Sequence, residues 1–234
     1  MNGLRTAVRP VDGLLSCANR SQIRMVAWSI SHASPYRRRT RWSGLRWFAR
    51  LDVVNVDDVP RLEGTGVILR DVRDGDAARR AALGRRREIV RGFGGDIAED
   101  APMTEEEATF ELGHRFGRGP HWVIADHTDT FLGILRLAPV DTANRSARLG
   151  VGIFDPDRLG RGLGTEAMRL ALSYGFGSLG LHRVSLTVLA DNARAVAAYT
   201  ALGFQTEGRL RETLWRDGRW CDDLTMAVLA ADWA

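Results

Sequence analysis

Three glycines at alternate positions, Gly160, Gly162 and Gly164, form the segment of this sequence best suited to bind a phosphate group. Glycine tolerates positive φ and close backbone approach, so successive N–H groups can point into one concavity. The segment lies between an apolar stretch and an amphipathic one, which places it between a strand and a helix N-terminus, where anions are favoured. The spacing predicts a pyrophosphate site, to which Arg161 adds a cation. Taken alone, the loop also fits a turn that needs glycine for its geometry only.

A second segment combines a punctuated helix with one tyrosine. Asn192 is a residue type that caps helix N-termini, and Gly203 ends the helix before Phe204. Tyr199 lies two turns after the cap, and a phenol with an ordinary pKa of about 10 can donate a proton to a leaving group. Tyr199 also fits a half-buried tyrosine that packs at a helix–sheet contact.

The composition excludes several other chemistries. All 33 Lys+Arg side chains are arginine, which excludes a Schiff-base lysine and a phosphate-loop lysine. Cys17 and Cys221 are far apart, so neither a disulfide framework nor a metal site is indicated, and a reducing, cytoplasmic setting is expected. No apolar stretch approaches the roughly 18 residues of a membrane span. The G-x-G-x-x-G match at Gly175, Gly177 and Gly180 follows a helix and precedes a strand, the reverse of dinucleotide binding.

Strands and helices alternate from Gly64 onward and must position these residues. Asp217-Gly218 is typical of a hairpin turn, between residues 213–215 and the run 220–228. The apolar periodicity predicts strands at 67–70, 121–125, 131–137, 147–154 and 184–189, and helices at 74–87, 104–116, 163–175 and 193–202. The predicted fold is α+β, or mixed α/β, around one sheet.

Together the two segments resemble the signature of the GNAT acyltransferases. That signature is Arg/Gln-x-x-Gly-x-Gly/Ala before a helix, then a strand, then Asn-x-x-Ala-x-x-x-Tyr-x-x-x-Gly-Phe, here 192–204. The resemblance runs from about Gly66 to the C-terminus, and residues 204–208 and 215–220 look most like the ribosomal-protein alanine N-acetyltransferases. It implies a central, mostly antiparallel sheet of about six or seven strands flanked by helices. It also implies an N-acetyltransferase that moves an acetyl group from acetyl-CoA to a primary amine by direct attack in a ternary complex, with a protein or peptide N-terminus as the expected acceptor.

The resemblance also implies a role for individual residues. The backbone of Gly152, Ile153 and Phe154 would hold the pantetheine arm as if it were another strand, and an N–H near Ile153 would stabilise the oxyanion. Asn192 would contact the cofactor arm, and Tyr199 would protonate the departing thiolate. Pyrophosphate would be bound by the amides of the loop and the helix start, namely Gly160, Arg161, Gly162, Leu163, Gly164 and Thr165.

The chain departs from the family pattern at the expected general base. Leu159 replaces the first Arg or Gln of the motif, and Arg148 and Thr187 occupy strand positions where some relatives carry a glutamate base. Other candidates for the base, each of which also fits a surface or hydrogen-bonded role, are Glu99, Glu111, His114 and His121. The acidic residues between Asp96 and Glu107 fit either an attraction for a cationic amine or a solvated helix face.

Residues 1–60 differ in composition from the rest, with ten arginines and four aspartates for a net charge of +6, whereas the whole chain carries +4. We expect a disordered leader at 1–60 and a catalytic domain at 61–234; a nucleic-acid or ribosome contact and a targeting segment are the alternatives for the leader. The remaining functional alternatives are acetylation of a small-molecule amine, a non-catalytic acyl-CoA-binding regulatory module, and a nucleic-acid-binding protein. No membrane association is expected, and either a monomer or a homodimer fits.

Overall fold

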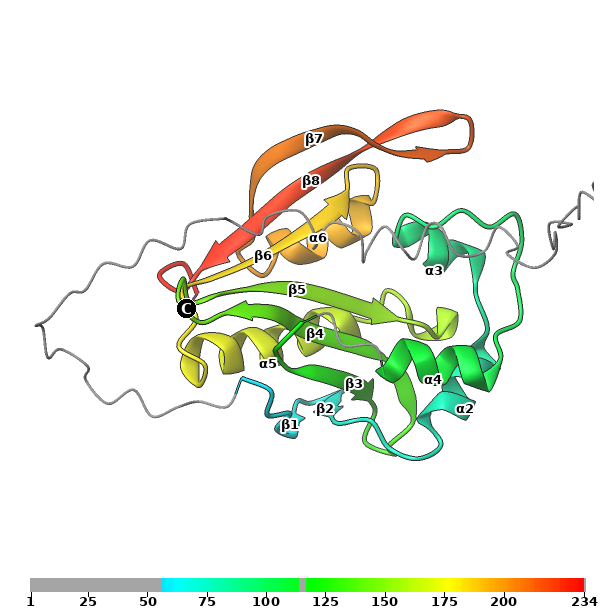
Figure 1. The fold of residues 1–234 in the computed structure, drawn as a ribbon, viewed down its shortest axis with the longest axis horizontal. Coiled ribbons are helices and arrows are strands. Elements are labelled where there is room, and N and C mark those ends of the chain that lie inside the picture. Colours follow the sequence, from blue (N-terminus) through cyan, green and yellow to red (C-terminus); the bar gives the residue numbers. More distant parts are fainter. Residues whose placement is uncertain (1–55, 114–116, 234) are drawn as a thin grey trace, which may run out of the picture. The chain divides into compact units, whose positions relative to one another are not determined.

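The computed structural model describes residues 56–113 and 117–233 (Figure 1), so most of the expected leader, and His114, lie outside the described residues. The elements in chain order are β1 (Leu62–Glu63), β2 (Ile68–Arg70), α2 (Asp76–Leu83), α3 (Arg87–Gly92), α4 (Glu105–Gly113), β3 (His121–Ala125), β4 (Phe131–Asp141), β5 (Ser146–Ile153), the short 3₁₀ turn η2 (Pro156–Arg158), α5 (Leu163–Gly177), β6 (Arg183–Leu189), α6 (Ala193–Thr200), β7 (Gln205–Arg216) and β8 (Arg219–Leu229). Within this described part, every helix is too short or too polar to cross a bilayer.

One sheet of eight strands carries the fold, in the order β1-β2-β3-β4-β5-β6-β8-β7. Every neighbouring pair is antiparallel except β5 and β6, which run parallel. The predicted α+β class and the mostly antiparallel sheet are therefore confirmed. The sheet has one strand more than expected, because the two-residue β1 is too short to leave a periodic pattern in the sequence.

The helix predicted at 74–87 is wrong in its second half. The chain leaves α2 at Gly84, where φ is +63°, and a separate helix, α3, begins at Arg87. Glycine adopts positive φ without the steric cost that a β-carbon adds, so it ends the helix there. The predicted capping box is present at α4, where the Thr104 hydroxyl accepts from the Glu107 N–H at 3.2 Å and the Glu107 carboxylate accepts from the Thr104 N–H at 2.9 Å.

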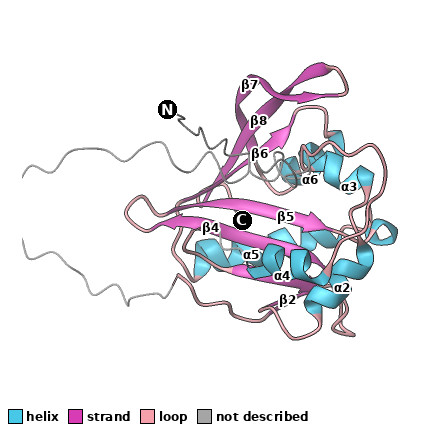
Figure 2. Cartoon of the chain, turned by 45° about the vertical axis from the view of Figure 1, so that its right-hand side comes forward, coloured by secondary structure: helices cyan, strands magenta, loops and turns pink. Residues whose placement is uncertain are grey.

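Apolar side chains form two clusters, one on each face of the sheet, and helices cover both faces (Figure 2). The larger cluster joins α5 and α6 to one face through residues such as Met168, Leu172 and Phe204. A smaller cluster on the other face includes Ile89 of α3 and Phe154, with side chains of α2 and α4 packed around it. We call the face of the sheet that α5 and α6 cover the α5/α6 face, and the opposite face the α3 face.

The described chain contacts the domain from its first residues. Val56 is buried, and the Asp57 carboxylate accepts from the Gly119 N–H at 3.1 Å and from Arg118 at 3.0 Å. The Pro60 carbonyl accepts from the indole of the buried Trp122 at 2.8 Å. Residues 56–60 thus contact the part of the chain that was expected to start at residue 61, so a truncated chain should begin no later than Val56.

Candidate active site

The two central strands pair over only part of their length. The parallel ladder between β5 and β6 covers three pairs and ends at Arg148↔Ser185, although β5 continues to Ile153 and β6 to Leu189. On its other side β5 stays paired with β4 up to Gly133↔Ile153. Figure 1 shows β5 and β6 diverging after their shared start. The segment of β5 after Arg148 thus has an unpaired side, which we call the open edge.

At the open edge, Ile153 presents both of its backbone polar groups. The next amide, of Phe154, donates to the Leu132 carbonyl on β4 at 2.9 Å. The preceding carbonyl, of Gly152, also points to β4, since a Cβ added to Gly133 would lie 1.9 Å from its oxygen. Because peptide units are planar and trans, the Ile153 N–H and C=O must both point away from β4, toward the open edge.

The glycine-rich loop meets the N-terminus of α5 as predicted. Gly160 and Gly162 have φ of +72° and +79°, and a Cβ added to either would meet nothing within 4 Å. Gly162 is the N-cap of the 15-residue α5 and provides no side-chain cap. The N–H groups of the first turn, at Leu163, Gly164 and Thr165, have no carbonyl partner within the helix. The space in front of these amides is therefore free for an anion.

One acidic residue lies in the first turn of α5, but its carboxylate is directed elsewhere. Glu166 accepts from the Thr65 hydroxyl at 2.7 Å and from the Gly66 N–H at 3.0 Å. These hydrogen bonds outweigh the burial and lower its pKa. Arg161 is exposed and makes no ion pair among the described residues. The charge beside the glycine loop that is free to meet a ligand is therefore positive.

Tyr199 lies on α6 with its ring against Phe204, at a centroid separation of 5.8 Å. Among the described residues, its hydroxyl has no hydrogen-bond partner. Burial raises the pKa of Tyr199 to about 12, so the phenol stays protonated across the neutral range. A protonated donor without an internal acceptor is free to bond to a ligand atom.

Asn192 ties α6 to α3 at the end of β6, and Figure 2 shows these two helices next to each other. Its side-chain oxygen caps α6 by accepting from the Ala195 N–H at 3.2 Å, and its amide nitrogen donates to the Gly92 carbonyl at 3.2 Å. Arg194 adds an ion pair to Glu88 at 3.1 Å. The Asn192 side chain is thus occupied within the protein, on both its acceptor and its donor.

The chain segment after α3 covers the α3 face beside the open edge. Phe93 packs over Gly152, where an added Cβ would lie 2.5 Å from the phenyl ring. Arginines anchor this segment to the β7–β8 hairpin: Arg91 pairs with Asp217, and the buried Arg216 donates to the Arg91 carbonyl at 3.0 Å and to Asp191 at 2.6 Å. These contacts fix the wall that a substrate approaching from the α3 face would meet.

None of the described candidates for the general base lies at the open edge. Glu111 pairs with the buried Arg80 at 2.8 Å, Glu99 is exposed, and His121 on β3 is held by its Nδ1 contact with the Gly119 carbonyl at 2.9 Å. Two of the six acidic residues between Asp96 and Glu107 are ion-paired, Asp100 with Arg86 at 3.1 Å and Glu107 with Arg85 at 2.9 Å.

Sequence reasoning missed one carboxyl, that of Asp223. It is half-buried on β8, opposite Leu189 of β6, and burial raises its pKa. The sequence held a hint, because Asp222 and Asp223 are adjacent within an expected strand, and alternation sends one of any such pair to each face.

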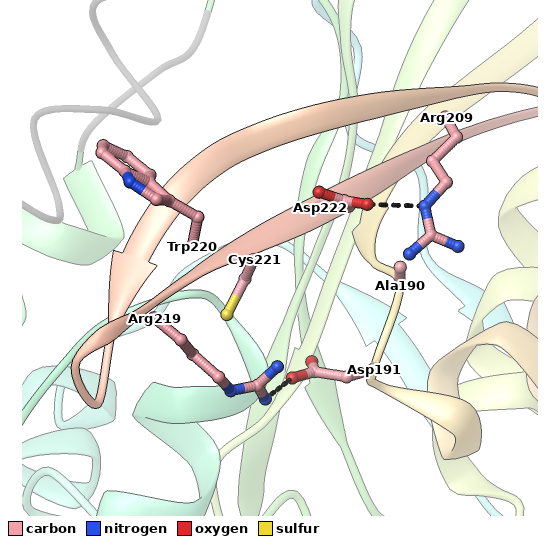
Figure 3. Close-up of a pocket in the computed structure, with 7 residues that line it drawn as sticks. All are labelled: Ala190, Asp191, Arg209, Arg219, Trp220, Cys221 and Asp222. Atoms are coloured by element: carbon pink, nitrogen blue, oxygen red, sulfur yellow. Dashed lines mark hydrogen bonds and ion pairs between the residues drawn. The ribbon is translucent and has the colours of Figure 1, made fainter.

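A hollow of about 180 Å³ lies between the end of β6 and the hairpin (Figure 3). It is lined by Ala190, Asp191, Arg209, Arg219, Trp220, Cys221 and Asp222. Both of its carboxylates are ion-paired, Asp191 with Arg219 at 2.8 Å and Asp222 with Arg209 at 2.6 Å. This hollow therefore offers less chemistry than the open edge.

Comparison with known proteins gives a consistent result. The model of the acetyltransferase (GNAT) domain matches residues 67–205. The uncharacterized N-acetyltransferase YoaA of Bacillus subtilis is 30% identical over 161 residues, which are 68% of this chain and 90% of YoaA. The crystal structure of a Vibrio cholerae spermidine N-acetyltransferase in complex with CoA and spermine superposes with a TM-score of 0.60 at 26% identity, covering 72% of this chain and 98% of that one. YdaF of Bacillus subtilis, whose name assigns it provisionally to ribosomal N-acetylation, is 31% identical over 101 residues, which are 43% of this chain and 55% of YdaF.

Proposed function

The chain belongs to the GNAT acetyltransferases and is an N-acetyltransferase, and from this we propose that it transfers an acetyl group from acetyl-CoA directly to a primary amine held in the same complex. The observation that carries this proposal is the open edge of β5 in line with the glycine loop at the start of α5. An extended arm with amide groups fits the first feature, and a pyrophosphate fits the second.

The residues that would hold acetyl-CoA are suited to it in detail. The Ile153 N–H and C=O are available to an amide-bearing arm, as a neighbouring strand would use them. The amides of Leu163, Gly164 and Thr165 can bind phosphate oxygens, with the open space at Gly160 and Gly162 admitting them. When bound, acetyl-CoA supplies a thioester whose carbonyl carbon is the electrophile. We keep the assignment of Asn192 to the cofactor arm only for the second hydrogen of its side-chain amide, since its side-chain oxygen and both of its backbone groups are occupied.

In the proposed mechanism, backbone and phenol act at opposite ends of the thioester. An N–H of the open edge stabilises the negative charge that develops on the carbonyl oxygen, and Tyr199 donates to the sulfur as the C–S bond breaks. Burial keeps Tyr199 protonated at the pH at which a neutral amine attacks. The role of the protein is therefore to place the two donors and to exclude water.

The raised pKa of Tyr199 predicts the alkaline side of the pH profile. A group whose pKa is raised keeps its proton to higher pH, so the donor form should persist until pH approaches 12. We expect kcat, measured with saturating substrates, to stay flat from pH 8.5 to 10.5. A fall with an apparent pKa of about 9 to 10 would assign an ordinary, solvated tyrosine to the step and contradict the burial argument.

For the acceptor we propose a primary amine of low pKa, with a protein or peptide N-terminus as the best match. Two of the acidic residues near α4, Asp100 and Glu107, are paired with arginines, and the α3 face carries the arginines Arg136 and Arg148 beside the open edge. Burial, with the neighbouring Arg148, lowers the pKa of Arg136 to about 10. Like charges disfavour a polycation such as spermidine on this face.

The proton balance points in the same direction. Near pH 7.5 an α-amine with a pKa of about 7.7 to 8.0 is roughly a quarter to a third neutral, whereas an amine with a pKa of about 10.4 is about 0.1% neutral. The difference corresponds to about 3.4 kcal/mol, which a site for lysine or a polyamine must offset with stronger proton removal. The subgroup suggested by residues 204–208 and 215–220 acts on protein N-termini and fits this preference.

The test compares kcat/KM for short peptides with free N-termini, their N-blocked lysine-containing counterparts, and spermidine, with release of free thiol as the readout. We expect the free N-termini to exceed both others by at least tenfold. If spermidine or the blocked peptides are favoured by tenfold instead, the acceptor resembles that named for the Vibrio cholerae protein, and the α-amine proposal fails while the enzyme class stands.

A further inference from the structure

Asp223 lies on the face of the sheet from which an amine would approach. Its neighbours along β8, Leu224 and Met226, belong with Val228 to the cluster on the α5/α6 face, so alternation places Asp223 on the α3 face. The ladder pairs Asp223 with Leu189. Leu189 in turn touches the segment after α3, since a Cβ added to Gly94 would lie 3.9 Å from its side chain.

The strand register relates this carboxyl to the open edge. The β5–β6 ladder ends at Arg148↔Ser185, and continuing that register would set Leu189 across from Gly152. Leu189 of β6 therefore faces the open edge, and Asp223 lies next to Leu189 on the following strand, β8. On the same face, Gly150 of β5 lies under the guanidinium of Arg136 and Gly152 lies under Phe93. On β6, the Thr187 hydroxyl accepts from Arg148 at 3.0 Å.

The surroundings of Asp223 differ from those of the other acidic residues. Its partner is the Thr213 hydroxyl of β7, and no arginine pairs with it among the described residues. The nearest charges acting on it are two further carboxylates, of Asp222 and Asp191. Those two are ion-paired to Arg209, Arg216 and Arg219. Of the other arginines on this face, Arg91 pairs with Asp217, Arg148 bonds to Thr187, and Arg136 lies over Gly150 of β5.

We propose that Asp223 is the group that binds the acceptor ammonium and takes its proton. A half-buried carboxyl with a hydroxyl partner and no cation of its own is the arrangement that a cationic substrate completes. Its raised pKa is consistent with this, because burial, the largest cause, favours the protonated form that the step produces. This inference rests on the proposed acetyl transfer and names the base that the sequence did not supply.

The step balances with the groups at hand. The ammonium gives one proton to the Asp223 carboxylate, leaving a neutral amine whose lone pair forms the new C–N bond. The nitrogen then loses its second proton to solvent, Tyr199 gives its proton to the departing sulfur as the C–S bond breaks, and solvent restores Tyr199 and Asp223. Each turnover releases one proton overall, as amide formation from an ammonium requires.

Asp223→Asn tests the assignment in the full chain with a free-N-terminus peptide as acceptor. We expect kcat/KM to fall by about 100-fold at pH 7.5, within the range usual for proton transfer. Between pH 7.5 and pH 10 the neutral fraction of the peptide amine rises from about a quarter or a third to nearly all, so the loss should shrink by about three- to fourfold. Asp223→Glu should recover part of the activity at pH 7.5. Calorimetric affinity for acetyl-CoA and the melting temperature should match the wild type.

Asp222→Asn is the matched control, because it removes a carboxylate from the adjacent position on the opposite face and should leave kcat/KM within threefold. The assignment is overturned if the Asp223→Asn variant keeps wild-type activity. It is also overturned if the variant loses activity equally at pH 7.5 and pH 10. A loss that comes with weaker acetyl-CoA binding or a lower melting temperature also overturns it, as a structural effect. If the wild type itself turns over no amine, it is the proposed function that fails.

Discussion

Gly162→Trp is expected to abolish acetyl-CoA binding. Gly162 sits at the N-cap of α5 with φ of +79° and with nothing within 4 Å of the place that a Cβ would occupy. An indole there would fill the space through which the pyrophosphate must approach the amides of the first turn. We expect isothermal calorimetry to show an affinity weakened by more than about 100-fold, which corresponds to the loss of most charge-assisted contacts at the loop.

Gly180→Trp is the control for this substitution. Gly180 also has positive φ, at +62°, and also has nothing within 4 Å, but it lies beyond the other end of α5. Gly180→Trp therefore imposes a backbone strain similar to that of Gly162→Trp, but its indole does not approach the glycine loop. The phosphate-binding assignment fails if the Gly162 variant is folded and binds acetyl-CoA as well as the wild type, or if both variants lose binding equally.

Tyr199→Phe is expected to lower kcat by roughly 10²- to 10⁴-fold, the usual contribution of a positioned general acid. Phenylalanine keeps the ring contact with Phe204 and removes only the hydroxyl, which has no partner among the described residues. The fold and the affinity for acetyl-CoA should therefore change little. Steady-state kinetics with a free-thiol readout, together with calorimetry, separate these effects.

Tyr174→Phe provides the comparison. Tyr174 is also a helical tyrosine whose pKa is raised by burial, but it lies on α5, where its ring packs against Trp122 of β3. We expect that variant to keep kcat within twofold. Wild-type turnover after Tyr199→Phe would remove this residue from the mechanism, and a matching loss in both variants would indicate a general packing effect.

Local features of this fold could be predicted because short stretches of sequence determine them. The Asn192 cap, the positive φ at Gly160 and Gly162, and the Asp217-Gly218 turn, with φ of +50° and +73°, depend on residues within one turn of each other. The break at Gly84 could have been predicted in the same way, but a lone glycine inside a helical pattern is also tolerated, so the pattern alone did not decide it.

The site depends on contacts that no local pattern records. The open edge exists because β5 and β6 stop pairing after Arg148, and α3 and α6 are joined near it by the hydrogen bond from Asn192 to the Gly92 carbonyl. Glu111 is a candidate base in the sequence, but in the structure its carboxylate pairs with Arg80, which lies 31 residues earlier in the chain. Asp223 gains its significance from Leu189 and Thr213, on two other strands, and from the lack of an arginine beside it.

The open edge also bears on how the protein avoids self-association. An unpaired strand invites another chain to add to it, and the outer strands here are poor templates, since β1 has two residues and the ladder of β7 with β8 is irregular at two places. The open edge of β5 lies instead in the middle of the sheet, between strands joined at one end by their ladder and flanked at the other by the α3–α6 contacts. A second polypeptide with its side chains is too bulky to enter such a gap, whereas a slender amide-bearing arm is not. The same confinement that selects the ligand thus keeps the sheet from polymerising.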